Sequence, residues 1–332
     1  MQYDNLYESF LALKKSADKN AYNVISLKDL PHKLGISTEG YPMFFVRTNG
    51  SSGVIKNSIR ENLSVEYCVD CRIVENDGEV LNDIYSIITL RALDRHLQIY
   101  FIDIFLMMLQ KLQSEPSRRE LSIEIEKIIT IFSALNNPPK KKIQGVWTEL
   151  LVIERSKTPE ALINAWHTAP SSKYDFTMGQ DKIEVKSTSS EMRVHKFTLD
   201  QLNPSLNSRL LIASSIVRES GKCINGLSVK GLYDKIAEKV LSLDAKIQLN
   251  KVIAETIGSD ISKWDDVYFD YVAATDTLAF YDFQQIPRLC KDNIPNGVSE
   301  VKFCSNLTNV EDIKSPNSDF DISSSPLFNC LF

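Results

Sequence analysis

The sequence lacks the signatures of several classes of protein. No Gly-x-Ser-x-Gly elbow and no Gly-x-x-x-x-Gly-Lys loop occurs, so we expect neither a serine hydrolase nor an autonomous NTPase. No uninterrupted apolar run reaches ~18 residues, so no membrane-spanning helix is expected. The first residues do not follow the basic, apolar pattern of a signal peptide. These absences predict a cytoplasmic protein that does not enter a membrane.

The cysteines and histidines do not predict a disulfide framework or a zinc site. The six cysteines are scattered along the chain: Cys68, Cys71, Cys223, Cys290, Cys304 and Cys330. Cys68 and Cys71 have a zinc-like spacing, but there is no second pair, and in a strand the two side chains would face opposite sides. His32, His96 and His167 are far apart in the sequence and lack metal-ligand spacing.

The composition is that of an ordinary soluble globular protein, with 43% hydrophobic and 24% charged residues. A chain of 332 residues can bury a sizeable core and suggests two or three domains. The net charge of −5 argues against a general nucleic-acid coat protein, although it is compatible with a local basic cleft.

The segment Asn136-Asn137-Pro138-Pro139 is the clearest loop signal in the chain, and it predicts a domain boundary. The first predicted domain, residues 1–137, is an α+β module without a chemical motif, so we expect a scaffold or a specificity role. Its hydrophobic pattern predicts a helix over 4–19, strands over 41–46 and 63–74, and helices over 99–112 and 117–135.

Two further domains are predicted after this boundary, over residues 138–220 and 221–332. The last of these is predicted to be an α+β region with an irregular end. Its predicted elements are helices over 231–243 and 244–257, a hairpin of strands 268–274 and 278–283, a strand over 298–304 and an irregular tail over 314–325.

Residues 174–188 predict a β-hairpin with two unlike faces. A turn at 179–180 would pair Asp175 with Glu184, and a turn shifted by one residue would pair Asp175 with Lys186. Because side chains alternate along a strand, all three polar residues share one face in either register. The opposite face carries apolar residues suited to packing: Phe176, Ile183 and Val185. Two carboxylates and an amine on rigid backbone indicate a chemical site.

The elements around the hairpin follow a definite order. A helix that ends near Arg155 and a short helix precede it. A third strand over 193–198 and a helical turn over 199–202 follow it. The apolar, β-branched run over 210–217 then predicts a buried central strand.

This order resembles that of the PD-(D/E)XK phosphodiesterase superfamily, the restriction-endonuclease-like nucleases. The matching motif is Asp175 followed by Glu184-Val185-Lys186, with Glu149 on the preceding helix. Four segments look more narrowly like the PD-(D/E)XK motif proteins of bacterial restriction and phage-defence gene clusters: 145–151, 174–176, 183–188 and 193–197. Tyr174 stands where the superfamily name has proline.

The resemblance implies an α/β (α+β) fold. Its restriction-endonuclease-like core would be a helix, three strands, a helix and a strand, flanked by an N-terminal α+β module and a C-terminal α+β region.

Phosphodiester hydrolysis needs charge neutralisation on the phosphate and an activated water. Mg²⁺ prefers oxygen ligands, which Asp175, Glu184 and the backbone carbonyl of Val185 would supply, and Mn²⁺ would be a possible substitute. Lys186 points to the same face as Glu184, where an amine can orient or help to deprotonate the water or hold a phosphate oxygen.

The preceding helix offers two candidate carboxylates. Glu149 flanks its apolar stripe, and Glu154 falls nearer the middle of the stripe one turn later. Geometry alone does not decide between them. The resemblance favours Glu149, which would bind metal directly or through water.

Several residues near the hairpin are candidates for contacts with nucleic acid. Arg193 and His195 would share one face of the third strand, with Lys196 between them, and this pattern also fits a solvated strand edge. Gln201 could approach the site from the helical turn. A basic run before the first helix could bind the phosphate backbone, although such runs are more often a solvated helix start: Lys140, Lys141 and Lys142.

We therefore predict a magnesium-dependent DNA endonuclease with a role in restriction or anti-phage defence. The alternative is a catalytically silent nuclease-fold subunit that binds DNA or a partner within a multi-protein defence complex. The complete Asp-Glu-x-Lys set favours the enzyme. The expected partners are DNA and either a second copy of the chain or other proteins of such a complex.

Overall fold

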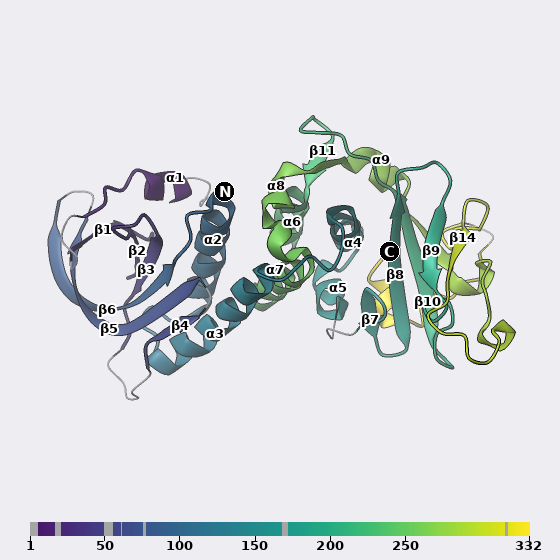
Figure 1. Cartoon of the computed structure of the whole chain (residues 1–332), viewed down its shortest axis with the longest axis horizontal. Helices are drawn as coiled ribbons and strands as arrows, with labels where there is room; N and C mark the ends of the chain where they lie inside the picture. The colour runs from purple at the N-terminus through teal and green to yellow at the C-terminus, as the bar shows by residue number, and fades with distance from the viewer. Residues whose placement is uncertain are drawn as a thin grey trace. The chain divides into compact units, whose positions relative to one another are not determined.

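The chain forms two compact units, Met1–Asn137 and Pro138–Phe332, which are described separately (Figure 1). The second unit is not divided at residue 220. The structure is a computed structural model that describes the following residues: 6–16, 21–49, 56–60, 62–75, 78–167, 172–315 and 318–332. Among these residues no helix combines the length and the apolar character needed to cross a membrane.

The first unit contains a small β-barrel and two long helices. Its elements are α1 (Leu6–Leu11), β1 (Ala21–Ser26), β2 (Lys33–Ile36), β3 (Pro42–Val46), β4 (Ser58–Arg60), β5 (Leu63–Val74), β6 (Val80–Leu90), α2 (Arg95–Lys111) and α3 (Arg118–Leu135). Of the helix predicted over 4–19, the structure shows α1, and residues 1–5 and 17–20 lie outside the described part. The strand predicted over 63–74 is present as β5 with those bounds, and the other predicted elements of this unit are present with shifted ends.

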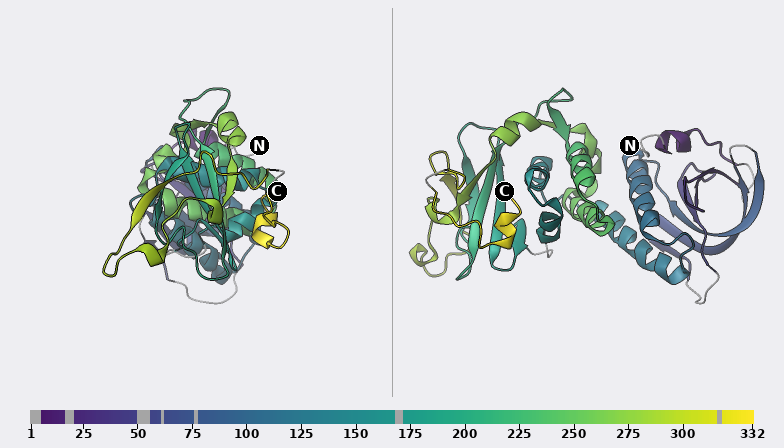
Figure 2. Two further views of the ribbon diagram at one scale, coloured as in Figure 1. Left: turned by 90° about the vertical axis from the view of Figure 1, so that its right-hand side faces the viewer. Right: turned by 180° about the vertical axis from the view of Figure 1, so that it is seen from behind.

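The sheet of the first unit has the order β1-β2-β3-β6-β5. It closes on itself because β1 pairs antiparallel with β2 and parallel with β5. A bulge between Glu66 and Val69, where Cys68 has φ 55°, bends β5 as closure requires. Figure 2 shows the resulting curvature of β5 and β6. The interior is filled by apolar side chains: Val24, Met43, Phe45, Cys71, Ile73, Tyr85 and Ile87.

The second unit contains a central sheet, a helical layer and a smaller strand pair. Its elements are α4 (Ile143–Arg155), α5 (Pro159–Ala165), β7 (Phe176–Met178), β8 (Asp181–Thr188), β9 (Val194–Thr198), β10 (Arg209–Ile216), β11 (Gly226–Ser228), α6 (Val229–Lys239), α7 (Leu243–Ile257), η1 (Gly258–Ser262), α8 (Lys263–Asp266), β12 (Tyr268–Asp270), α9 (Tyr271–Asp276), β13 (Ala279–Asp282), η2 (Phe283–Gln285), η3 (Lys291–Asn293), β14 (Lys302–Asn306) and α10 (Pro326–Asn329). The α+β fold class predicted from the sequence is confirmed.

The central sheet has the order β13-β10-β8-β7, with β8 and β10 parallel and the other neighbours antiparallel. The β7–β8 hairpin turns at residues 179–180, where Gly179 has φ 58°, a conformation that glycine adopts without strain. Phe176 pairs with Ile183, so the register is the one that sets residue 175 opposite residue 184.

Helices cover one face of this sheet and a second strand pair covers the other (Figures 1 and 2). α4 packs on β8, α6 packs on α4, and α5 packs on α7. On the opposite face, β9 pairs with β14 over an apolar cluster. The members of this cluster are Tyr174, Phe197, Leu202, Leu210, Ile212, Tyr281, Ile286 and Leu307. The hairpin is therefore held from both sides.

The predicted third strand is present as β9 and pairs with β14, outside the central sheet. Two other predictions for this unit were wrong. Residues 199–202 form turns instead of a helical turn. Residues 268–274 and 278–283 do not form a hairpin, because Asp270 caps helix α9 in the middle of the predicted first strand. β12 instead pairs with β11, and β13 pairs with β10.

Candidate functional site

Asp175 lies at the point where the hairpin ladder ends. β7 pairs with β8 only from Phe176 onward, and beyond this pair Asp175 Oδ2 accepts the backbone N–H of Val185 at 2.7 Å. Because the N–H and C=O of one strand residue point to the same edge, the Val185 carbonyl is directed to this side too. The Asp175 side chain is thus fixed at the edge of β8, and the residue is only 4% exposed.

Glu149 reaches the same place from helix α4. It is 2% exposed, and its Oε2 accepts a hydrogen bond from Trp166 Nε1 at 2.7 Å. His167 Nε2 lies 2.9 Å from the same oxygen and 3.9 Å from Asp175 Oδ1. One ligand atom each from Glu149, His167 and Asp175 lies within 4.8 Å of the other two, so these residues form a group that could hold a metal ion.

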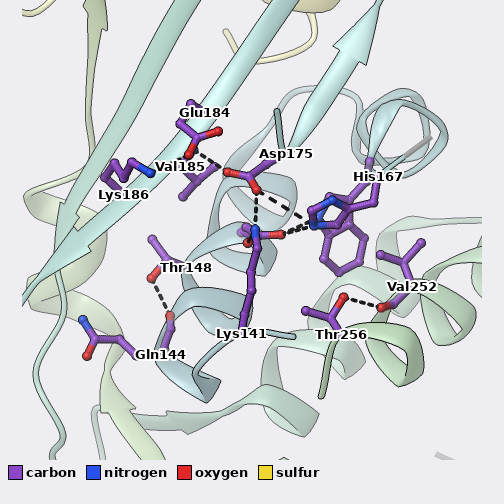
Figure 3. Close-up of polar contacts among 12 residues, drawn as sticks. Lys141, Gln144, Thr148, His167, Asp175, Glu184, Val185, Lys186, Val252 and Thr256 are labelled. Carbon is purple, nitrogen blue, oxygen red and sulfur yellow. Dashed lines mark hydrogen bonds and ion pairs between the residues drawn. The ribbon is translucent and has the colours of Figure 1, made fainter. Parts of the chain in front are cut away.

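Lys141 places its ammonium between the two carboxylates. Its Nζ is 2.5 Å from Glu149 Oε1 and also forms an ion pair with Asp175 Oδ1 (Figure 3). Lys141 precedes α4, and its ammonium reaches Glu149, about two helical turns further along the chain. A position between two buried carboxylates that accepts an ammonium is electrostatically suited to a metal cation, and the donor set of carboxylate oxygens and one imidazole nitrogen fits one.

Burial and Lys141 together set the ionisation of this group. Burial by itself would raise the pKa of Glu149, but Lys141 and His167 hold it below its usual value. Burial and the charge of Glu149 raise the pKa of Asp175 in spite of Lys141. Burial opposes the charge on Lys141, yet the two carboxylates raise its pKa. One cation therefore stabilises two closely spaced carboxylates.

Glu184 and Lys186 form a second polar group on β8. Lys186 Nζ lies 2.5 Å from Glu184 Oε1, and Gln201 Nε2 donates to the same oxygen at 2.6 Å. Burial and the charge of Asp175 raise the pKa of Glu184 to about 8, against the opposing effect of Lys186. The two groups are thus electrostatically linked, although the structure gives Glu184 no place in the Glu149–His167–Asp175 group.

The carboxylates and the basic groups differ in exposure. The side chains of Glu149, Asp175 and Glu184 are 2–5% exposed, whereas those of Lys141, His167 and Lys186 are 18–33% exposed. The acids therefore form the floor of the site and the bases lie toward solvent. An anion that approaches would meet positive or neutral groups first.

The other candidate residues are placed elsewhere. Glu154 accepts from Lys239 Nζ at 2.8 Å and from the Tyr271 hydroxyl at 2.9 Å, so it belongs to a different contact, and Glu149 is the α4 carboxylate at the site. His195 is 4% exposed, and its Nε2 lies 2.8 Å from Ser214 Oγ.

Arg193 donates to the backbone carbonyls of Ser214 and Thr277. The interior contacts of Arg193 and His195 argue against the phosphate role considered for them. Lys140, Lys142 and Lys196 are exposed. Lys141, considered with them as a contact to DNA, is instead part of the carboxylate cluster.

The sequence did not indicate His167 or Trp166. Both lie just after α5, where Trp166 bridges to Phe176 and the N–H of His167 donates to the Asp175 carbonyl at 2.9 Å. No sequence pattern marked His167 as a metal ligand, because no other ligand residue lies near it at a spacing typical of metal sites. His167 is brought to Glu149 by the packing of α5 against α4.

A comparison with models of known protein families found a match for this chain. Searches of curated proteins and of solved structures found no match. Residues 7–308 match the model of a family described as "Putative PD-(D/E)XK family member, (DUF4420)". The match covers both units and includes the acidic residues and Lys186 of the site. The chain therefore belongs to this PD-(D/E)XK-related family.

Proposed function

We propose that the protein is a magnesium-dependent endonuclease that hydrolyses phosphodiester bonds in DNA. The observation that carries the proposal is the arrangement of three buried carboxylates on α4, the end of the hairpin and β8, with Lys186 beside one of them. Such a floor of acids under a rim of bases suits a reaction on an anionic phosphodiester that requires a cation.

The residues that would hold the ion are Glu149, Asp175, Glu184 and the Val185 carbonyl. When bound, Mg²⁺ would neutralise phosphate charge and lower the pKa of a coordinated water, and Mn²⁺ would be able to replace it. The protein's part is to keep these oxygens in place. The Val185 N–H orients Asp175, and the Trp166 indole orients Glu149.

Lys186 would act on the attacking water or on a non-bridging phosphate oxygen. Glu184 holds its ammonium at 2.5 Å, and Gln201 donates to the same Glu184 oxygen at 2.6 Å. We assign Gln201 a positioning role, because its amide contacts Glu184 and not the solvent-facing amine. An amine restrained in this way needs little reorganisation when the substrate arrives.

DNA is the proposed substrate, and restriction or anti-phage defence is the proposed setting. The exposed bases Lys140, Lys142 and Lys196 would supply backbone contacts, which depend on charge and not on sequence. Because the chain carries a net charge of −5, we expect these contacts to form a local basic patch and not to extend over the whole surface. We therefore propose that a second copy or a protein of a defence complex helps to bring the chain to DNA.

The test is a cleavage assay on duplex, single-stranded and methylated DNA with Mg²⁺ or EDTA, with and without the products of neighbouring genes. Lys186→Met is expected to slow cleavage by about 10²-fold or more, the usual contribution of a positioned acid–base group. Glu184→Gln is expected to abolish it. Metal-independent cleavage, or cleavage at full rate by both variants, would contradict the proposal.

Helix α4 supplies a matched pair of variants for the same assay. Glu149 and Glu154 are both buried on this helix, but only Glu149 contacts the candidate site. We expect Glu149→Gln to lose cleavage and Glu154→Gln to keep it, once circular dichroism shows that both are folded. The reverse result would reject Glu149 as the helix carboxylate.

A catalytically silent DNA-binding subunit is the second candidate. The observation in its favour is that the Lys141 ammonium pairs with both Glu149 and Asp175, the two carboxylates that would otherwise face a cation. This hypothesis predicts that the protein cleaves DNA under none of the conditions above. It also predicts that the protein binds DNA and that Asp175→Ala leaves this affinity unchanged.

A further inference from the structure

His167 has a left-handed backbone conformation. Its φ is 42°, in the left-handed region that residues other than glycine seldom occupy. The strain is maintained by neighbouring contacts, since its N–H donates to the Asp175 carbonyl and Trp166 bridges to Phe176. Strained residues that the surrounding structure holds in place are concentrated at functional sites. The conformation therefore suggests a functional role for the His167 side chain.

The imidazole of His167 is aimed at the two carboxylates that flank Lys141. Nε2 is 2.9 Å from Glu149 Oε2 and 3.9 Å from Asp175 Oδ1, and the side chain is 20% exposed. Figure 3 shows the ring and the Lys141 amine converging on Asp175 from different directions. One imidazole nitrogen thus lies within 4 Å of an oxygen of each carboxylate.

We infer that His167 is a direct metal ligand, and that with Glu149 and Asp175 it makes the site prefer a transition-metal ion such as Mn²⁺ over Mg²⁺ and Ca²⁺. This inference rests on the metal site of the proposed function. Carboxylate oxygens accept all three ions, whereas imidazole nitrogen favours first-row transition metals. The donor set Glu149–His167–Asp175 contains one such nitrogen beside two carboxylates.

The surroundings support a ligand role for His167. Trp166 Nε1 donates to Glu149 Oε2 at 2.7 Å, the kind of outer contact that orients a metal-binding carboxylate. Asp175 is oriented by the Val185 N–H at 2.7 Å. His167 itself is oriented by its backbone bond to Asp175. All three proposed ligands are thus held in position by groups that would not bind the ion.

The test is spectroscopic and does not depend on catalysis. The full-length protein is loaded with Mn²⁺, and electron spin echo envelope modulation is recorded to detect ¹⁴N coupling from a directly bound imidazole. His167→Asn is the main variant, because asparagine tolerates positive φ but its shorter side chain offers no ring nitrogen. His167→Gln is a second variant, and His96→Asn on α2 is the matched control.

We expect ¹⁴N modulation in the wild-type protein and in His96→Asn, and its loss in both His167 variants. In calorimetric titrations, the affinity for Mn²⁺ should fall roughly 10- to 100-fold in the His167 variants, at least the loss seen for residues that merely support a ligand. The affinity for Mg²⁺ should fall less, so the preference for Mn²⁺ collapses. Wild-type Mn²⁺ protein without ¹⁴N modulation, or an unchanged preference in the variants, would overturn the inference.

These outcomes separate the inference from the proposed function. Magnesium-dependent cleavage without ¹⁴N modulation would leave the nuclease proposal standing and remove His167 as a ligand. Nitrogen-coordinated Mn²⁺ without cleavage of any DNA would support the ligand and remove the nuclease. Failure to bind either ion would reject the ligand role.

Discussion

Replacing Lys141 by methionine would leave Glu149 and Asp175 without the ammonium that pairs with both, while a long unbranched side chain remains. Removing one partner of a buried ion pair costs about 3–5 kcal/mol, because a buried charge loses its compensation. A third of the Lys141 side chain is exposed, so water can partly replace it. We therefore expect a loss near the lower end of this range, about 3 kcal/mol, in the absence of metal.

Metal should have the opposite effect on this variant. In the wild-type protein an ion must displace the Lys141 ammonium from Glu149 Oε1 and Asp175 Oδ1. In Lys141→Met it does not, so the affinity for metal should rise. At a metal concentration of about 100 times the Kd, binding stabilises the native state by about 2.7 kcal/mol, which would offset most of the loss.

The assay is urea unfolding followed by tryptophan fluorescence, with EDTA or with Mn²⁺. All three tryptophans lie in the second unit, so the signal reports that unit: Trp147, Trp166 and Trp264. Lys142→Met is the matched control, since this neighbouring lysine is exposed, and it should change stability by less than about 0.5 kcal/mol. Equal stability of the two variants in EDTA, with equal gains from metal, would refute the reasoning.

Three further predictions concern stability. Gly179→Ala should cost about 1–2 kcal/mol, because φ is 58° and an added Cβ meets nothing within 4 Å, so the change is backbone strain alone. Gly145→Ala inside α4, where the nearest atom would be 3.9 Å away, should instead stabilise the second unit by about 0.5–1 kcal/mol, and urea unfolding measures both. Burial lowers the pKa of His32 and of His195 from 6.5 to about 4, so the unfolded chain binds more protons between these values. The resulting stability is complete above pH 6.5 and is lost as the pH falls toward 4, by about 3 kcal/mol for each histidine, and urea unfolding at a series of pH values should show this slope.

The hairpin could be predicted from the sequence because its signals are local. Glycine at 179 and the alternation of polar and apolar residues define the turn and the faces within a few positions. The sequence left two registers open, and the structure shows the one with the turn at 179–180. Asp175, Glu184 and Lys186 were found for the same reason, since they follow the hairpin pattern directly.

Other features depend on contacts between distant segments. The helical pattern alone did not separate Glu149 from Glu154 on α4, and only the resemblance favoured Glu149; in the structure Lys239 and Tyr271 bind Glu154. The strand predicted over 268–274 failed because an aspartate cap at Asp270 outweighed the aromatic residues that flank it.

His167 was missed because neither spacing nor periodicity marks it. Its role depends on a left-handed backbone and on the packing of α5 beside α4. No local pattern in the sequence encodes either of these features.

The most direct test of the account compares the rate of DNA cleavage by the wild-type protein and by Asp175→Asn at saturating Mg²⁺. Asp200→Asn is the control, because Asp200 is exposed and pairs with Lys291 outside the site. We expect the wild-type protein and the control to cut DNA at equal rates, EDTA to stop both, and Asp175→Asn not to cut. Cleavage by Asp175→Asn at the wild-type rate would contradict this expectation.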